Sequence, residues 1–355
     1  MKIRVLIVDD SAFMRKVITQ MLQSDEEIEV IGAARNGLEA VEKVRTMKPD
    51  IVTLDVEMPV MNGIEALKII MKETPLPVLM VSSLTEEGAQ VTLDALDIGA
   101  VDYLPKNLSN ISLNISKIKE DLLAKIKAIG SQKIKFDKKK KREFNSISGL
   151  NMEAGKELKK FKSLSGKVAV VAIGVSTGGP KALQEILPIF PKDFSAGILV
   201  VQHMPKAFTG VFAERLNQMS KIEIKEAENG DKIRSGLALI APGNMHMTVE
   251  RKSPLETAIK LSNEPADTLY KPSVDVMMKT VAQTYAGRCV GVILTGMGHD
   301  GRDGIKAIKE TEGKTLAQDE ESCVVFGMPK SAIDIGVIDK VVPLSQMAFE
   351  IMNMV

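Results

Sequence analysis

Short apolar, β-rich runs alternate with amphipathic segments in two separate stretches of this 355-residue chain. The first stretch holds five such runs, at residues 3–8, 28–33, 51–54, 78–81 and 101–104. Strands that are joined by crossover helices lie parallel and are covered on both faces. This stretch therefore predicts an α/β domain of the (βα)5, flavodoxin-like type.

The second stretch repeats the alternation with a different spacing. Strands are expected at 168–173, 197–201 and 290–294, with shorter β segments between 237 and 261 and a helix at 301–309. This pattern predicts a doubly wound, mainly parallel α/β domain.

The residues between the two stretches lose this periodicity. They carry a basic run, Lys138–Arg142, without the interleaved aromatic residues or amphipathic anchor of a nucleic-acid or membrane patch, so a solvated linker is favoured over such a patch. The predicted organisation is a domain over 1–125, an interdomain helix or linker over 126–166, and a second domain over 167–355.

Composition excludes several classes of protein. The net charge is +1 and 26% of the residues are charged. The chain therefore lacks the excess of basic residues that is typical of a nucleic-acid-binding protein. With only two cysteines, the chain has neither a disulfide framework nor a site of spaced thiolates. No apolar run reaches the ~18 residues of a membrane span, and no secretory apolar region precedes Asp9, so the protein is expected to be cytoplasmic.

Polar residues stand at the carboxyl ends of the first domain's strands, which share one edge of a parallel sheet. They are Asp9 and Asp10 after the first strand, Asp55 at the third, Ser82 at the fourth and Lys106 after the fifth. Three clustered carboxylates require a cation, and an all-oxygen set suits Mg²⁺. Asp55 could then accept a phosphoryl group whose oxygens Lys106 and Ser82 contact. A helix-capping role would explain one of these acids, but not three together with a lysine.

Residues 1–125 resemble response-regulator receiver domains through Leu54–Pro59 and Asn62-Gly63. The resemblance implies that Asp55 is the phosphoacceptor and that Ser82 and Tyr103 form the switch pair. It also implies a Mg²⁺ ion held by Asp10, Asp55 and the backbone carbonyl of Glu57, with Asp9 in support. One departure is that Pro105 precedes Lys106 and Asn107 follows it, whereas many receivers have a proline after the lysine.

The second domain carries a possible nucleophile. Gly174–Pro180 has the pattern G-x-S-x-G between a strand and a helix, which exposes the hydroxyl of Ser176. His203 ends the neighbouring strand, and Asp300 lies in a glycine-rich strand-to-helix turn. These three residues predict a Ser-His-Asp triad, with the backbone N–H groups of Thr177 and Met297 as candidates for the oxyanion hole.

The glycine-rich turn has two other interpretations, which the sequence disfavours. A glycine-flanked serine can be an ordinary turn or cap, but the three residues all follow predicted strands. A dinucleotide site lacks both G-x-G-x-x-G spacing and an acid after the next strand, which ends in Gln202-His203. The chain order Ser, His, Asp also differs from that of α/β-hydrolases.

Residues from about 167 to 355 resemble the catalytic domain of chemotaxis protein-glutamate methylesterases, the CheB family. The motifs are Gly-x-Ser-Thr-Gly-Gly, Gln-His-Met-Pro, Ala241-Pro242-Gly243 and Thr-Gly-Met-Gly-x-Asp-Gly. The resemblance implies hydrolysis of glutamate methyl esters through a seryl acyl-enzyme, without a cofactor, and deamidation of glutamines by the same route. It assigns the triad to Ser176, His203 and Asp300, places His246 near the cleft but outside the triad, and gives His299 no role.

The resemblance also implies partners and control. Methyl-accepting chemoreceptors are the expected substrate and a chemotaxis histidine kinase is the phosphodonor; nucleic acid is not expected, and contact with the membrane is only through receptors. The unphosphorylated receiver is expected to pack over the active-site cleft. The alternative is a phosphorylation-controlled binding protein with a non-catalytic output domain, although no helix-turn-helix is evident.

Overall fold

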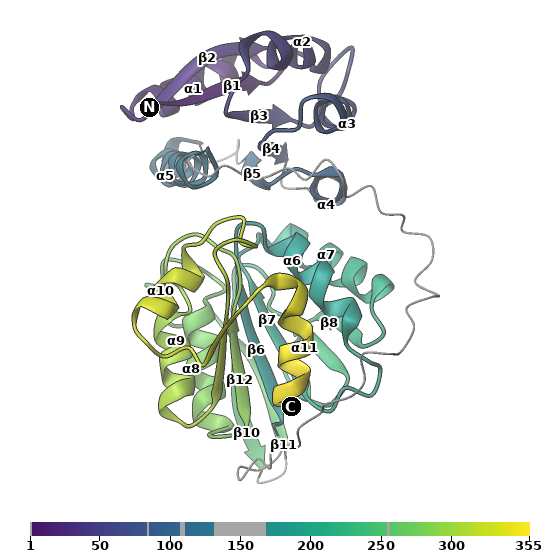
Figure 1. Ribbon diagram of the computed structural model, residues 1–355, viewed down its shortest axis with the longest axis vertical. Coiled ribbons are helices and arrows are strands. Elements are labelled where there is room, and N and C mark those ends of the chain that lie inside the picture. Colours follow the sequence, from purple (N-terminus) through teal and green to yellow (C-terminus); the bar gives the residue numbers. More distant parts are fainter. Residues whose placement is uncertain (1, 84, 107–110, 131–167, 254–255) are drawn as a thin grey trace.

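The computed structural model describes residues 2–83, 85–106, 111–130, 168–253 and 256–355, which form two α/β units (Figure 1). The first contains a five-stranded parallel sheet in the order β2-β1-β3-β4-β5. Its elements are β1 (Ile3–Val8), α1 (Ala12–Gln23), β2 (Ile28–Ala34), α2 (Gly37–Met47), β3 (Ile51–Asp55), α3 (Gly63–Glu73), β4 (Val78–Ser83), α4 (Glu86–Ile98), β5 (Asp102–Lys106) and α5 (Ile111–Gly130). The predicted (βα)5 fold is confirmed.

Helices cover both faces of this sheet. Apolar side chains of α1 and α5 share one buried cluster, and those of α2, α3 and α4 belong to another. The loop before α3 explains the Asn62-Gly63 pair: Asn62 and Glu65 form a capping box, and a Cβ on Gly63 would lie 1.9 Å from the carbonyl oxygen of Asp55. Only glycine fits beside the phosphoacceptor candidate.

The order of Pro105 and Lys106 has a structural explanation. Pro105 lies within β5, beside Ser82 of β4, and β5 is an edge strand that pairs with no other strand among the described residues. Proline is tolerated there because no second strand needs its N–H. Lys106 is thus the last residue of β5, whereas Asn107 lies outside the described residues.

The second unit contains a seven-stranded sheet in the order β14-β13-β12-β6-β7-β9-β8, and every pairing in it is parallel. Its elements are β6 (Val170–Val175), α6 (Gly179–Ile186), η2 (Leu187–Ile189), β7 (Gly197–Gln202), α7 (Lys206–Met219), β8 (Glu223–Glu226), β9 (Leu237–Ile240), β10 (His246–Ser253), β11 (Glu256–Ser262), α8 (Val274–Thr284), β12 (Cys289–Ile293), α9 (Arg302–Glu310), β13 (Lys314–Gln318), α10 (Met328–Asp334), β14 (Lys340–Val342) and α11 (Leu344–Met354).

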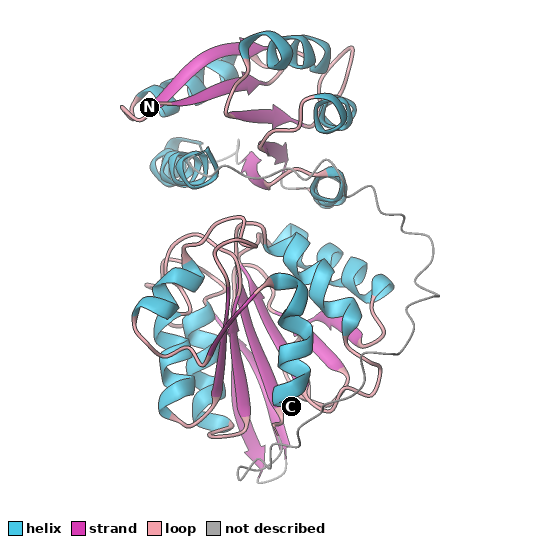
Figure 2. Ribbon diagram, in the orientation of Figure 1, coloured by secondary structure: helices cyan, strands magenta, loops and turns pink. Residues whose placement is uncertain are grey.

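Helices α6, α7 and α11 cover one face of this sheet, and α8, α9 and α10 cover the other (Figure 2). The doubly wound fold is therefore confirmed. The β segments expected between 237 and 261 divide into β9 of the main sheet and a separate antiparallel hairpin, β10–β11. Strands β8, β13 and β14 were not predicted.

The predicted linker over 126–166 begins inside α5, and residues 131–167 lie outside the described part of the chain, as does the basic run. None of the helices among the described residues combines the length and apolar character that crossing a bilayer requires.

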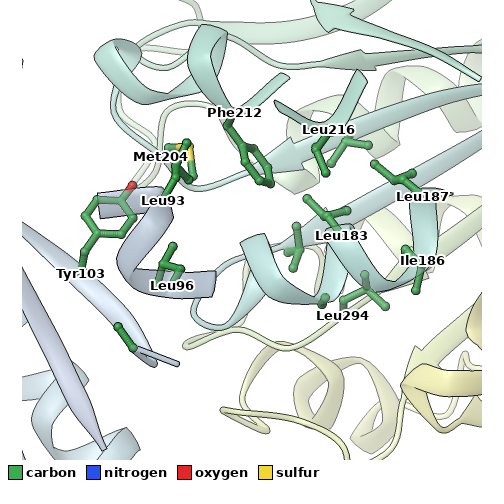
Figure 3. Close-up of a cluster of buried hydrophobic side chains, with 14 of the residues drawn as sticks. Leu93, Leu96, Tyr103, Leu183, Ile186, Leu187, Met204, Phe212, Leu216 and Leu294 are labelled. Atoms are coloured by element: carbon green, nitrogen blue, oxygen red, sulfur yellow. The ribbon is translucent and has the colours of Figure 1, made fainter. Parts of the chain in front are cut away.

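The two units share a buried apolar interface. Leu93 and Leu96 of α4 and Tyr103 of β5 lie beside Leu183 of α6 and Phe212 of α7 in one cluster (Figure 3). At its border, Arg215 of α7 forms ion pairs with Asp94, at 2.6 Å, and with Asp97. Val325 of the second unit makes a second contact. It belongs to the buried cluster that includes Leu104 and Leu122 of the first unit.

Candidate active site

Three adjacent strands bring Ser176, His203 and Asp300 to one sheet edge. Ser176 directly follows β6, the central strand of the three; His203 follows β7, and Asp300 precedes α9 in the connection from β12. The turn at Ser176 is held by a hydrogen bond from its N–H to Thr295 O (3.0 Å) and by one from Gly179 N–H to its carbonyl (2.8 Å).

Glycines permit the close packing around this serine. Gly178 has φ +77°, a left-handed conformation that favours glycine. A Cβ on Gly296 would lie 2.9 Å from the Cβ of Ser176. The glycine-rich turn after β12 therefore lies directly against the nucleophile candidate.

Asp300 and His203 are joined by a hydrogen bond of 2.8 Å between Oδ2 and Nε2. Asp300 also accepts from the N-terminus of α8: the Ser273 hydroxyl (2.9 Å) and the Asp275 N–H (3.0 Å) bind Oδ1, and the Val274 N–H (2.7 Å) binds Oδ2. Burial acts to raise the pKa of Asp300, but the contact with His203 and the two amides outweigh it, so the net shift is downward. An ionised Asp300 accepts from Nε2–H, which leaves Nδ1 as the basic nitrogen of His203.

One further contact fixes the imidazole of His203, and another fixes its backbone. Its ring stacks on Tyr270, with centroids 4.2 Å and planes 9° apart. The side-chain amide of Gln202 donates to Ser176 O (3.0 Å) and to His203 O (3.1 Å), which connects the turn at Ser176 to the end of β7 at His203. Within the described residues, the buried Nδ1 has no hydrogen-bond partner. Ser176 Oγ therefore does not donate to it in this structure.

Thr295 organises the oxyanion-hole candidates. Its hydroxyl donates to Thr177 O (2.9 Å) and accepts from the N–H groups of Val324 (3.1 Å) and Val325 (3.0 Å). The N–H groups of Thr177 and Met297 donate no hydrogen bond to any other residue in the described ranges. Both amides are therefore available to an oxyanion.

The other two histidines are differently placed. His246 is fully buried, and its Nδ1 accepts from Ser273 N–H (3.2 Å) while Nε2 lies 3.1 Å from Pro265 O. Burial lowers the pKa of His246 below its usual value, against the opposing effect of the hydrogen bond to Pro265 O. His299 is exposed at the turn before α9.

The acidic cluster of the first unit is also assembled. Carboxylate oxygens of Asp9, Asp10 and Asp55 lie within 4.8 Å of one another, and Lys106 Nζ lies 2.7 Å from Asp55 and 2.9 Å from Asp9. Burial raises the pKa of Asp55 to about 6, against the opposing effect of Lys106. This all-oxygen site, in which Asp9 and Asp55 are buried and Asp10 is exposed, fits a hard divalent cation.

The remaining receiver candidates surround this cluster. The Glu57 N–H donates to Asp55 Oδ1 (3.4 Å), which places the backbone of Glu57 beside the cluster. Ser82 is buried and its hydroxyl donates to Gly88 O (3.3 Å). Tyr103 is buried at the interface, away from solvent.

Comparisons with known proteins agree with this architecture. Residues 171–351 match the family model described as CheB methylesterase, and residues 5–116 match the response regulator receiver domain. The chain belongs to the CheB methylesterase family. A CheB relative from Pyrococcus horikoshii, named protein-glutamate methylesterase/protein-glutamine glutaminase, is 49% identical over 97% of this chain and 91% of its own length. A relative of the same name from Lawsonia intracellularis is 48% identical over 97% of each chain.

The structural comparison covers the second unit. The crystal structure of the Thermotoga maritima CheB methylesterase catalytic domain matches with a TM-score of 0.52 and 40% sequence identity, over 53% of this chain and 100% of that chain. Membership of the CheB family does not favour the alternative of a non-catalytic output domain.

Several residues at the CheB site were not singled out from the sequence. Gln202 was noted only as part of a motif, although an amide immediately before a strand-end histidine can bridge two strand ends. Ser273 stands before an amphipathic run, which is the signature of an N-cap. Thr295 likewise belongs to the motif Thr-Gly-Met-Gly-x-Asp-Gly, whereas Tyr270 carries no such signal, because its contact with His203 depends on the packing of distant segments.

Proposed function

We propose that this chain hydrolyses glutamate methyl esters of chemoreceptors to glutamate and methanol, with Ser176, His203 and Asp300 as its catalytic triad. The hydrogen bond between His203 and Asp300, at the strand edge that also presents Ser176, carries this proposal. The names of the relatives support the same reaction.

The geometry suggests the role of each residue. Ser176 Oγ attacks the ester carbonyl carbon and transfers its proton to His203 Nδ1, while Asp300 stabilises the imidazolium through Nε2–H. The N–H groups of Thr177 and Met297 stabilise the oxyanion. His203 then protonates the leaving methoxide, methanol departs, and water activated by His203 hydrolyses the acyl-enzyme.

Deamidation of receptor glutamines follows the same steps. A glutamine side chain has a carbonyl carbon in the position of the ester, and attack by Ser176 releases ammonia in place of methanol. Both reactions pass through one acyl-enzyme and end in glutamate. No cofactor is needed for either.

Phosphorylation of Asp55 by a histidine kinase is the proposed control. Asp10, Asp55 and the Glu57 carbonyl would hold Mg²⁺, with Asp9 in support; the ion would neutralise the carboxylates and the incoming phosphoryl oxygens. Lys106 and Ser82 would bind the phosphoryl oxygens.

The interface offers a route from Asp55 to the second unit. Tyr103, the proposed partner of Ser82, packs on α7, which begins three residues after His203. Movement of Ser82 toward a phosphoryl group would free space for Tyr103 to reorient and loosen the contact between α4 and α7.

Methanol release from a methylated chemoreceptor, with and without acetyl phosphate and Mg²⁺, tests the proposal. We expect acetyl phosphate to stimulate the full chain and to leave Asp55→Asn unstimulated, and removal of residues 1–145 to raise basal activity. If the truncated chain is no faster than the unphosphorylated full chain, control by the receiver interface is wrong. Absence of methanol release from every form would overturn the esterase assignment.

A further inference from the structure

A buried chain of hydrogen bonds runs from the hairpin strand β10 to the triad carboxylate. His246, the first residue of β10, accepts the N–H of Ser273 at Nδ1 (3.2 Å), and the Ser273 hydroxyl donates to Asp300 Oδ1 (2.9 Å). Both His246 and Ser273 are buried, at 0% and 4% exposure. Among the described residues, neither residue has a hydrogen bond to Ser176.

The tautomer of His246 is fixed by its contacts. Because Nδ1 accepts from the Ser273 backbone, the ring proton resides on Nε2, which donates to Pro265 O (3.1 Å) and lies 3.1 Å from Thr268 Oγ1. The ring therefore holds the backbone just before α8 in one position.

Ser273 is at once the cap of α8 and a ligand of Asp300. Its Oγ accepts the N–H of Val276 (3.4 Å) as the N-cap, and the same hydroxyl donates its proton to Asp300. The next two amides, of Val274 and Asp275, donate to the same carboxylate. The carboxylate thus replaces water at the positive end of the helix.

A reciprocal contact closes the arrangement from the other side. The carboxylate of Asp275 accepts the N–H groups of Gly301 (2.9 Å) and Gly304 (2.6 Å) at the start of α9, directly after Asp300. Each helix N-terminus therefore binds the aspartate of the other. Three of the four hydrogen bonds that hold the Asp300 carboxylate come from the N-terminus of α8.

We propose that Ser273 and His246 are positioning residues of the triad, which hold the Asp300 carboxylate in the plane of the His203 ring. This inference rests on the proposed function of Ser176, His203 and Asp300. Four donors saturate the two oxygens of Asp300, so the loss of the Ser273 hydroxyl leaves Oδ1 under-bonded and lets the carboxylate rotate away from Nε2. A rotated Asp300 carboxylate stabilises the His203 imidazolium less well. Because the imidazolium forms during the chemical step, we expect kcat to fall.

The test compares kcat and KM for methanol release by the full chain with acetyl phosphate and Mg²⁺. For Ser273→Ala we expect kcat to fall about ten- to a hundredfold with KM nearly unchanged, the range for losing a hydrogen bond to a charged group. Ser273→Thr, which keeps the hydroxyl, should recover most of this loss. Ser273→Gly preserves capping better than alanine does and should still show the lowered kcat.

Thr280→Ala is the matched control. Thr280 lies on the same helix and its hydroxyl accepts the N–H of Val249 of β10, so the substitution disturbs the contact of α8 with β10 without touching Asp300. We expect its kcat to stay within about twofold of the unaltered chain. Equal losses of kcat in Thr280→Ala and Ser273→Ala would overturn the inference.

Variants of His246 test the hydrogen bond between the Ser273 N–H and His246 Nδ1. His246→Asn keeps an acceptor for the Ser273 N–H, whereas His246→Leu has a similar volume and no acceptor. We expect His246→Leu to lower kcat at least fivefold below His246→Asn. Equal kcat values for these two variants would contradict the role of His246.

Ser176→Ala, assayed in parallel, separates this inference from the proposed function. If Ser176→Ala is inactive while Ser273→Ala is as active as the unaltered chain, positioning by Ser273 is wrong and the triad stands. If Ser176→Ala retains its activity, the triad itself is wrong, and this inference fails with it.

Discussion

The ring of Tyr103 stacks on the ring of Phe208, with centroids 4.7 Å apart and planes 3° apart. Tyr103 comes from the edge strand of the receiver, and Phe208 lies in the first turn of α7, five residues after the proposed general base His203. Both side chains are buried. The proposed switch residue is thus part of the apolar contact between the two units, so any reorientation of its ring must change that contact.

Arg215 provides the clearest test of this interface. We expect Arg215→Glu to raise basal methanol release about fivefold and to reduce the stimulation by acetyl phosphate. The substitution replaces ion pairs with Asp94 and Asp97 by repulsion. Partly exposed pairs contribute about 0.2–1 kcal/mol each, so the two pairs together are worth on the order of 1 kcal/mol, which shifts a closed–open equilibrium about fivefold.

Arg234→Glu serves as its control. Arg234 forms an ion pair with Glu223, between β8 and the segment before β9, and this pair involves no residue of α4. This variant should leave basal activity and stimulation unchanged. Should both arginine variants show the same activation, the effect would come from net charge and not from the interface.

Ser176→Ala should lower esterase activity by about 10⁴ or more, because it removes the nucleophile and leaves the surrounding backbone contacts in place. Phosphorylation of Asp55 by acetyl phosphate and the thermal unfolding transition should be unaltered. Methanol release and incorporation of labelled phosphate measure the two effects separately. Substantial residual methanol release would sink the serine mechanism.

Much of this architecture was predictable from the sequence because strand ends in parallel sheets share an edge. The runs before Asp55, Ser176 and His203 are apolar and β-rich, so their positions and the convergence of these side chains could be inferred. Strand β8, Glu-Ile-Lys-Glu, is short and three of its four residues are charged, and it becomes a strand only because β9 pairs with it. Its local sequence is as compatible with a loop as with a strand, so a strand could not be predicted there.

The contacts that were not predicted depend on packing between distant segments. Ser273 could be expected to cap a helix, but that its hydroxyl also reaches Asp300 depends on how α8 packs against α9. The stack of Tyr103 on Phe208 depends on how two domains dock. Neither contact produces a periodicity or a residue spacing that could be recognised in the amino-acid sequence.

Buried His246 should contribute to the pH dependence of stability. Burial lowers its pKa below the ordinary value, and the charge of Lys271 adds to this, while Pro265 O, Asp300 and Glu264 oppose it. The unfolded chain then binds more protons at mildly acidic pH, so stability from this group is complete above about pH 6.5 and is lost as pH falls through the folded-state pKa. We expect the melting temperature of His246→Asn to fall less than that of the unaltered chain between pH 7.5 and pH 5.5. Parallel curves would show that His246 does not titrate on unfolding in this range.

Tyr270 is expected to support the orientation of His203 through its ring and not through its hydroxyl. The rings stack at 4.2 Å, and the hydroxyl of Tyr270 donates no hydrogen bond to the triad residues. A stacked aromatic pair contributes about 0.5–1.5 kcal/mol, so Tyr270→Ala should lower kcat about two- to tenfold, whereas Tyr270→Phe should retain it. Methanol release by chains lacking residues 1–145 is the appropriate measurement, because it removes any contribution of the receiver. An equal loss in the phenylalanine variant would assign the effect to the hydroxyl and contradict the stacking role.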